Sequence, residues 1–162
     1  AGTVYAALDE SGARPAGAFA QSSMRIEKRF LAYGHDMDSG TLPSVAGLEF
    51  AVDMTKDFIG AEALRTSKAA PPAVRTISIT FEDQNAVPLG GEPVYYNGTA
   101  IGKTTSAGFG YRIGRPVAIA VLDAATDGME VSVDIARTLH TGRVCDGAAF
   151  DPSGSRMRNK AP

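Results

Sequence analysis

Residues 94–108 read VYYNGTAIGKTTSAG, and this stretch decides the fold. Asn97-Gly98 stands between residues that favour β-strands. A two-residue type I′ turn needs positive φ at both central positions, and Asn and Gly adopt positive φ more readily than other residues. The stretch therefore predicts a β-hairpin with its turn at Asn97-Gly98.

Segments on both sides of this hairpin continue the β pattern. Ile77, Ile79 and Phe81 alternate with polar residues, as in a half-buried strand. The last two segments are expected to pair across Ala136-Arg137. The further predicted strands cover 75–83, 115–123, 129–135 and 137–144. Short strands at regular spacing, with turn residues between them, indicate an antiparallel barrel or sandwich.

The segment SMRIEKRFLAYGHD, residues 23–36, predicts an amphipathic helix that ends near Tyr33-Gly34 and carries an acid in an unexpected place. At about 100° per residue, Glu27 falls in the middle of the apolar arc. An unpaired carboxylate there costs several kcal/mol, so a group outside the helix must bind it. Glu27 is then either a structural acid that a backbone amide or a distant arginine satisfies, or a residue of a cleft. Arg25 projects away from it on the helical wheel and needs a partner of its own.

The rest of the first 70 residues mixes short helices with extended segments. Asp36 and Asp38 are interpreted as turn-forming residues. The other expectations are a helix over 3–11 ended by Gly12, an extended piece over 17–20, a loop over 36–47, a strand over 48–52 and a turn leading into a short helix over 57–64. Residues 67–74, SKAAPPAV, have the composition of a linker, and we place a domain boundary near residue 71.

Composition and charge exclude several classes of function. A net charge of -2 with both signs interspersed argues against nucleic-acid binding, and we interpret the basic residues at 156–160 as a solvated tail. The single Cys145 excludes an internal disulfide framework and fits a reducing compartment. The two histidines lack the spacing of a zinc site, and we expect no metal. No apolar run approaches the roughly 18–20 residues that span a bilayer, so we expect no membrane partner and a cytoplasmic location. The abrupt start suggests a missing upstream portion.

Three stretches resemble the folate-binding aminomethyltransferase superfamily. They read SMRIEKRFLAYGHDMDSGTLP (23–43), AGLEFAVDMTKDFIGAEAL (46–64) and VPLGGEPVYYNGTAIGKTTSAGFGYRIGRPVAIA (87–120). That superfamily includes the T-protein of the glycine cleavage system and the carboxyl-terminal halves of dimethylglycine and sarcosine dehydrogenases and oxidases. The resemblance runs from residue 4 to about residue 145 in the family's order.

The resemblance implies a chain that is mainly β with an α+β amino-terminal segment. Residues 1–70 would be the closing segment of the folate-binding domain. Residues 71–147 would be the carboxyl-terminal domain, an antiparallel six-stranded β-barrel of jelly-roll-like form. Residues 148–162 would be a tail.

Two details favour the dehydrogenase branch. Arg25, Ile26, Glu27 and Lys28 stand where T-protein usually reads R-L-E-A, and Gln21 stands where it has another arginine. The ending AAFDPSGSRMR, residues 148–158, is similar to the ending of the dehydrogenases. Val45 departs from many relatives, which carry an acid there.

By resemblance, Gln21, Arg25, Glu27 and Tyr33 would line or brace a folate cleft. Polar partners for Glu27 would come from earlier domains outside the chain. The family's catalytic aspartate lies upstream, and so does the FAD domain of the dehydrogenases, so we expect no catalytic residue within this chain.

The function implied is that of the carboxyl-terminal part of a tetrahydrofolate-dependent aminomethyltransferase-like protein. Its parent would be an FAD-linked dehydrogenase of the dimethylglycine or sarcosine type that acts on a methylated amine. Upstream domains of this parent would pack against the chain. The chain alone would be inactive. The alternative is a non-catalytic scaffold of the same superfamily, such as a relative used in iron–sulfur assembly or an interaction module.

Overall fold

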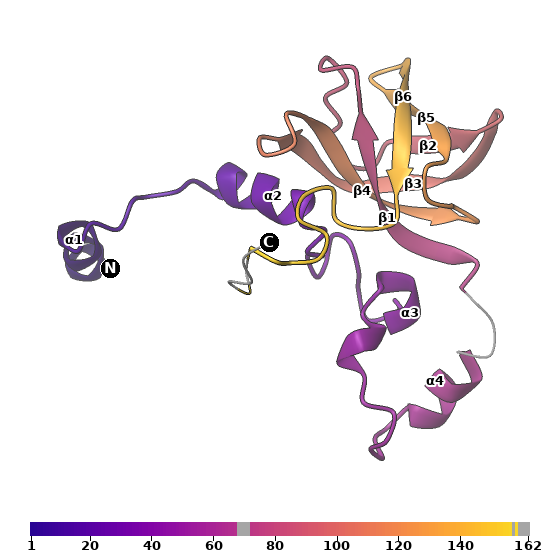
Figure 1. Cartoon of the computed structure of the whole chain (residues 1–162), viewed down its shortest axis with the longest axis horizontal. Helices are drawn as coiled ribbons and strands as arrows, with labels where there is room; N and C mark the ends of the chain where they lie inside the picture. Colours follow the sequence, from indigo (N-terminus) through magenta and orange to yellow (C-terminus); the bar gives the residue numbers. More distant parts are fainter. Residues whose placement is uncertain (68–71, 157, 159–162) are drawn as a thin grey trace.

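A computed structural model of the chain describes residues 1–67, 72–156 and 158, and it consists of a helical amino-terminal segment followed by a closed barrel (Figure 1). The helical elements are α1 (Gly2–Glu10), α2 (Ala18–Glu27), α3 (Pro43–Ala46), the 3₁₀ helix η1 (Glu49–Ala51) and α4 (Ala61–Ser67). The strands are β1 (Val74–Phe81), β2 (Pro93–Tyr96), β3 (Thr99–Gly110), β4 (Arg115–Asp123), β5 (Glu130–Ile135) and β6 (Thr138–Cys145). The expected six-stranded antiparallel barrel is confirmed. None of the helices in the described ranges has the length and apolar character needed to cross a membrane.

The strands follow the order β1-β4-β3-β2-β5-β6 around the barrel, and β6 returns to pair with β1. The β2–β3 turn has the geometry that the sequence predicts, with φ of 49° at Asn97 and 77° at Gly98. The expected pairing across Ala136-Arg137 also forms, with φ of 51° and 68° at these residues and Ile135 opposite Thr138. Two tight turns of one kind therefore set the register of both hairpins.

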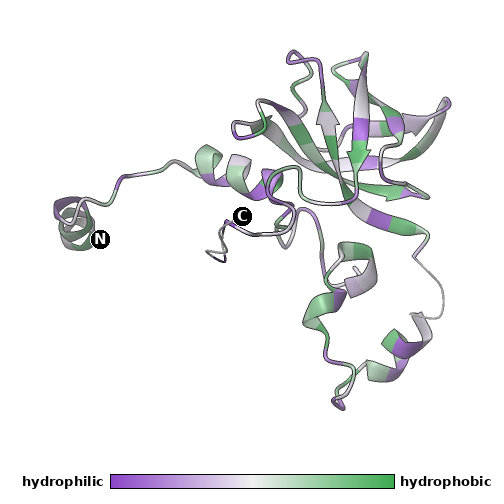
Figure 2. Cartoon of the chain, in the orientation of Figure 1, coloured by the Kyte–Doolittle hydropathy of each residue, from purple (hydrophilic) through white to green (hydrophobic). Residues whose placement is uncertain are grey.

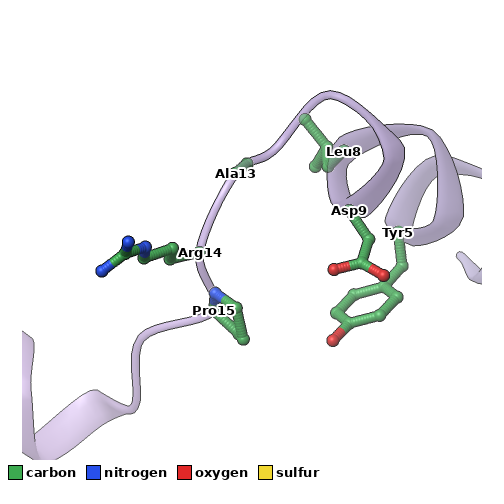
Figure 3. A pocket seen from close by; sticks show the side chains of 6 residues that line it. All are labelled: Tyr5, Leu8, Asp9, Ala13, Arg14 and Pro15. Atoms are coloured by element: carbon green, nitrogen blue, oxygen red, sulfur yellow. The ribbon is translucent and has the colours of Figure 1, made fainter.

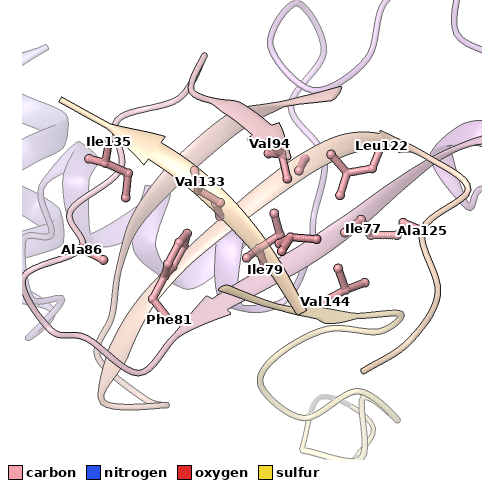
Figure 4. Close-up of a cluster of buried hydrophobic side chains, with 13 residues drawn as sticks. Ile77, Ile79, Phe81, Ala86, Val94, Leu122, Ala125, Val133, Ile135 and Val144 are labelled. Carbon is pink, nitrogen blue, oxygen red and sulfur yellow. The ribbon is translucent and has the colours of Figure 1, made fainter. Parts of the chain in front are cut away.

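The interior of the barrel holds the main hydrophobic core (Figure 4). The alternating residues Ile77, Ile79 and Phe81 of β1 are fully buried there, because every second side chain of a strand points to the same face. Residues from the other strands complete this core: Val94, Ala118, Ala120, Leu122, Val131, Val133, Ile135 and Val144. None of the described residues of the amino-terminal segment belongs to this core.

The helix that carries Glu27 differs from its predicted bounds at both ends. It begins at Ala18, so the extended piece predicted over 17–20 is wrong. It ends at Glu27, before the predicted Tyr33-Gly34, because Arg29 adopts a φ of 50° and turns the chain away. The amides of Arg29 and Phe30 bond back to the carbonyls of the last turn, which is the Schellman arrangement with arginine in place of glycine.

The segment after α2 also differs from prediction. The loop expected over 36–47 contains α3, which Gly47 ends with a φ of 68°. The strand predicted over 48–52 is wrong, since Glu49–Ala51 form the 3₁₀ helix η1. A strand at this position would have no neighbour, because the barrel is closed. The short helix expected after residue 57 is present as α4, and the domain boundary predicted near residue 71 lies outside the described residues.

Gly102 of β3 provides a test of the barrel packing. Its φ is +150°, and a Cβ there would lie 2.0 Å from the carbonyl oxygen of Val121 on β4. We expect Gly102→Ala to lower the free energy of unfolding of the 162-residue chain by roughly 1–3 kcal/mol in urea, because the backbones must separate. Gly2→Ala is the matched control, since no atom lies within 4 Å of the added methyl group. Equal unfolding curves for both variants would contradict this account.

Candidate functional site

The helix α2 lies against β3 and β4 on the outside of the barrel (Figure 1). Ile26 is 1% exposed and packs on Val117 and Ile119, which form a second, smaller hydrophobic cluster. The Ser23 hydroxyl donates a hydrogen bond to the carbonyl of Phe109, at 2.7 Å. One face of α2 is therefore fixed to the barrel by both apolar and polar contacts.

Glu27 has its hydrogen-bond partners within this chain. Its side chain is 1% exposed, and Oε1 accepts hydrogen bonds from the backbone amides of Arg112 at 2.7 Å and Ile113 at 3.0 Å. Both amides belong to the turn between β3 and β4. The prediction that a backbone amide can satisfy the Glu27 carboxylate is confirmed. The expectation that its partners come from absent domains is wrong, because this turn reaches the carboxylate directly.

Arg25 binds a second buried acid. Its guanidinium donates to Asp36 Oδ2 at 2.6 Å and to the Ser106 hydroxyl at 2.7 Å. The other contacts of Asp36 come from the Ala32 amide, at 2.8 Å from Oδ2, and from the Thr105 hydroxyl, at 2.5 Å from Oδ1. The network joins α2, the loop after it and β3.

Burial would raise the pKa of Asp36, but its hydrogen bonds outweigh that effect. The Thr105 hydroxyl, the Ala32 amide, the Ser106 hydroxyl and the charge of Arg25 together lower the pKa of this carboxyl below its usual value. Asp36 is therefore ionised at neutral pH and holds Arg25 as an ion pair, with side-chain exposures of 0% and 20%.

The four residues predicted to form a folate site divide into two pairs. Arg25 and Glu27 lie in the contact between α2 and the barrel. Gln21 is exposed on α2, and Tyr33 is 70% exposed in the following loop. The structure does not bring these four side chains together into one cluster, and their role in folate binding stays a prediction.

Sequence reasoning missed the partners of Arg25 and Glu27. Asp38 forms the expected turn by accepting a hydrogen bond from the Gly40 amide, whereas Asp36 points to Arg25. The only signal for this pairing was that a helical arginine lacked a partner within reach on its own helix. No pattern in the strands indicated that Thr105 and Ser106 would face α2.

Two hollows in the surface lie near the helices, and none of the four predicted residues lines either of them. One of about 120 Å³ separates α1 from the segment after it (Figure 3). Its lining residues are Tyr5, Leu8, Asp9, Ala13, Arg14 and Pro15. Another, of about 410 Å³, lies at the end of α2 beside Phe30 and Phe50. Across the described part of the chain, no group of three or more His, Cys, Asp or Glu side chains is placed to hold a metal ion.

Comparison with known proteins identifies the family. Residues 75–151 match the model of the glycine cleavage T-protein C-terminal barrel domain, and residues 1–56 match that of the GCVT N-terminal domain. The chain therefore belongs to the glycine cleavage T-protein family, and the resemblance found in the sequence is confirmed.

Relatives in this family include oxidising enzymes and an aminomethyltransferase. The chain is 34% identical over 158 residues to 4-methylaminobutanoate oxidase (formaldehyde-forming) of Paenarthrobacter nicotinovorans, covering 96% of this chain and 19% of the oxidase. It is 35% identical over 130 residues to human mitochondrial dimethylglycine dehydrogenase, covering 78% and 15%. The crystal structure of the glycine cleavage system aminomethyltransferase T from Bartonella henselae superimposes with a TM-score of 0.75 at 26% identity, covering 82% and 38%. The chain thus spans less than half the length of each of these proteins.

The ion pair of Asp36 predicts an acid-dependent loss of stability. Because its folded-state pKa lies below the usual value of 3.8, its stabilisation is present above about pH 5 and is lost as the pH falls through the folded-state pKa. We expect Asp36→Asn to lower the free energy of unfolding at pH 7 by roughly 1.5–3 kcal/mol. The difference from wild type should shrink steadily from pH 5 to pH 2 in urea titrations.

The exposed Asp57 supplies the control for this experiment. Asp57→Asn should leave the unfolding free energy within about 0.5 kcal/mol of wild type at each pH. A constant difference between wild type and Asp36→Asn across the whole pH range would show that the Asp36 charge does not stabilise the fold.

Proposed function

We propose that this chain is the carboxyl-terminal part of a tetrahydrofolate-dependent aminomethyltransferase-like protein. The parent would be an FAD-linked dehydrogenase of the dimethylglycine or sarcosine type that oxidises a methylated amine and passes a one-carbon unit to folate. The names of the oxidase and dehydrogenase relatives support this choice. This chain would build part of the folate site and would be inactive alone.

The observation that carries the proposal is the way α2 is held. Its inner face is fixed to the barrel through Ile26, Arg25 and Glu27, while Gln21 and Tyr33 remain outside these contacts. A helix held on the barrel, with an exposed amide on it and an exposed aromatic ring in the loop after it, would suit one wall of a cleft for a flat, polar ring system. In this arrangement Glu27 braces the wall and Tyr33 contacts the ligand.

The amino-terminal segment carries apolar side chains that the described fold leaves uncovered. Phe19 is 93% exposed, Phe50 86% and Ile59 106%. Hydrophobic residues recur along α1, α2 and α3 outside the barrel (Figure 2). Large apolar side chains that are exposed to this extent on several neighbouring segments are typical of a chain that contacts another domain. We infer that upstream domains of the parent cover this surface and complete the site.

The two cofactors would divide the chemistry of the parent. FAD would accept the electrons of amine oxidation, and tetrahydrofolate would take up the one-carbon unit. The residues of this chain would orient the folate and exclude water from its ring. FAD would bind to the upstream domain, since this sequence contains no glycine-rich phosphate loop of the dinucleotide type.

A non-catalytic scaffold is the second candidate, and one observation favours it. The polar groups of Arg25 and Glu27 already bond to Asp36, Ser106 and the β3–β4 turn. Gln21 and Val45 also depart from the pattern of T-protein. In a scaffold, α2 would serve only to join the barrel to neighbouring domains.

Isothermal titration of tetrahydrofolate into the complete parent protein separates the two candidates. The proposal expects saturable heat of tetrahydrofolate binding and turnover of a methylated amine in the parent. The 162-residue chain alone should show no turnover. No heat and no competition by substrate would favour the scaffold. Demethylation or one-carbon transfer by the 162-residue chain would contradict the claim that it is inactive alone.

Substitutions in the parent test the separate roles of Tyr33 and Glu27. Tyr33→Ala should weaken tetrahydrofolate binding roughly 2- to 10-fold, because an aromatic contact is worth about 0.5–1.5 kcal/mol, and should leave thermal stability unchanged. Glu27→Gln should lower stability by roughly 1.5–3 kcal/mol while the folded protein keeps its folate affinity.

Tyr96, on the β2–β3 hairpin, provides the control for the aromatic contact. Tyr96→Ala should leave folate affinity at the wild-type value. A reversed result, with Glu27→Gln stable but unable to bind folate, would assign Glu27 to ligand contact and contradict its bracing role.

A further inference from the structure

The segment after β6 folds back against the end of α2, so residues 146–156 are not a free tail (Figure 1). Ala149 packs against the cluster of Ile26, Val117 and Ile119. The Asp146 carbonyl accepts a hydrogen bond from the Arg29 guanidinium, at 3.0 Å. Contacts between this segment and the chain at the end of α2 therefore begin immediately after the barrel.

Phe150 closes a three-way contact with α2 and the β3–β4 turn. Its amide donates to the Glu27 carbonyl at 2.9 Å. Its ring centroid lies 6.0 Å from the guanidinium carbon of Arg112 and 5.3 Å from that of Arg156. Because the Glu27 carboxylate also bonds the Arg112 amide, the helix, the turn and this segment each contact the other two.

Asp151 forms the second attachment. Lys28 donates to its Oδ2 at 3.0 Å and to its carbonyl at 2.6 Å, and the two side chains are only 13% and 7% exposed. Asp151 Oδ1 accepts from the amide and the hydroxyl of Ser155, both at 3.0 Å. The hydrogen bond from Lys28 lowers the pKa of Asp151, so the carboxylate is charged at neutral pH.

These contacts reach α2 at the turn that carries Arg25. The helix has 10 residues, and a helix of that length is marginal in water without tertiary contacts. Its first turn is free of the barrel at Phe19, which is 93% exposed. The last turn therefore depends on two supports, which are the barrel on one side and residues 146–156 on the other.

We propose that residues 146–156 act as a strap that positions α2 for folate, with Phe150 and Asp151 as positioning residues that act through Glu27, Lys28 and the turn bearing Arg25. This inference rests on the proposed function for its effect on folate. The attachment itself is a property of the chain that can be measured without any ligand.

Amide hydrogen exchange in the 162-residue chain tests the attachment. Lys28→Met and Phe150→Ala should each speed exchange of the α2 amides over 23–27 by at least tenfold. The amides of Ile77 and Ile79 in the barrel should keep wild-type protection, which verifies that the variants fold. Lys28→Arg retains a donor for Asp151 and should restore slow exchange, and Ser153→Ala, at an exposed position of the strap, should change nothing.

The same variants in the complete parent test the effect on folate. The strap predicts that the KM for tetrahydrofolate rises at least fivefold in Lys28→Met and Phe150→Ala, while kcat for amine oxidation stays at the wild-type value. Lys28→Arg should return the KM to the wild-type range. Because Lys28→Arg restores only a donor for Asp151, recovery of the KM in that variant would assign the effect to this contact and not to a general loss of stability.

Two results would overturn the strap. The first is unchanged exchange of the α2 amides in both variants. The second is faster exchange with an unaltered KM in a parent that uses folate. A wild-type parent that does not bind tetrahydrofolate would instead overturn the proposed function. Faster α2 exchange in the variants would then still show that the strap stabilises α2.

Discussion

The joining of helix to barrel depends on one buried carboxylate. Glu27 lies on the apolar side of a short helix, where an unpaired charge would be costly, and the β3–β4 turn supplies two amide donors to it. Gly110 makes this approach possible, since a Cβ there would lie 3.0 Å from the Glu27 side chain and 2.7 Å from that of Ile113. Because the donors are backbone groups of a tight turn, their positions are set by the barrel. The position of α2 on the barrel is therefore set by the β3–β4 turn.

The described residues of the amino-terminal segment form no hydrophobic core of their own, and the segment is held in place through the attachment of α2 to the barrel. The buried clusters of the described residues lie within the barrel and in the small contact of α2 with β4. The Arg25–Asp36 pair fixes the loop after α2 to the helix, and the Arg29 guanidinium bonds the Thr76 carbonyl of β1. Polar contacts thus take the place of a hydrophobic interior over this part of the molecule. Such contacts fix the direction of the chain but leave large apolar side chains in solvent, and the relatives compared above are much longer than this chain.

The barrel could be predicted from the sequence because its signals are local. Alternation in 75–83 and the positive-φ residues at Asn97-Gly98 depend only on neighbours a few residues apart. The end of α2 could not be predicted, because an arginine at position 29 occupies a backbone region where glycine is the usual residue. Its guanidinium bonds the carbonyls of Thr76 and Asp146, residues distant in sequence, and these contacts compensate for the strained backbone. The pairing of Arg25 with Asp36 could not be predicted for the same reason, since the hydroxyl groups that complete this network come from β3. The need of Glu27 for an outside partner was predictable, but the identity of that partner was not.

Closure of the barrel has a consequence for how such a chain can be combined with others. All six strands have a neighbouring strand on both sides in the order around the barrel, so the sheet has no free edge strand to which another strand could be added. Any covalently linked polypeptide must be joined through side chains and helices on the outer surface, as α2 is. The barrel is closed without any strand from another domain. A unit with this property can be appended to enzymes of different length without altering its own ladder, which suits its occurrence in both an oxidase and an aminomethyltransferase.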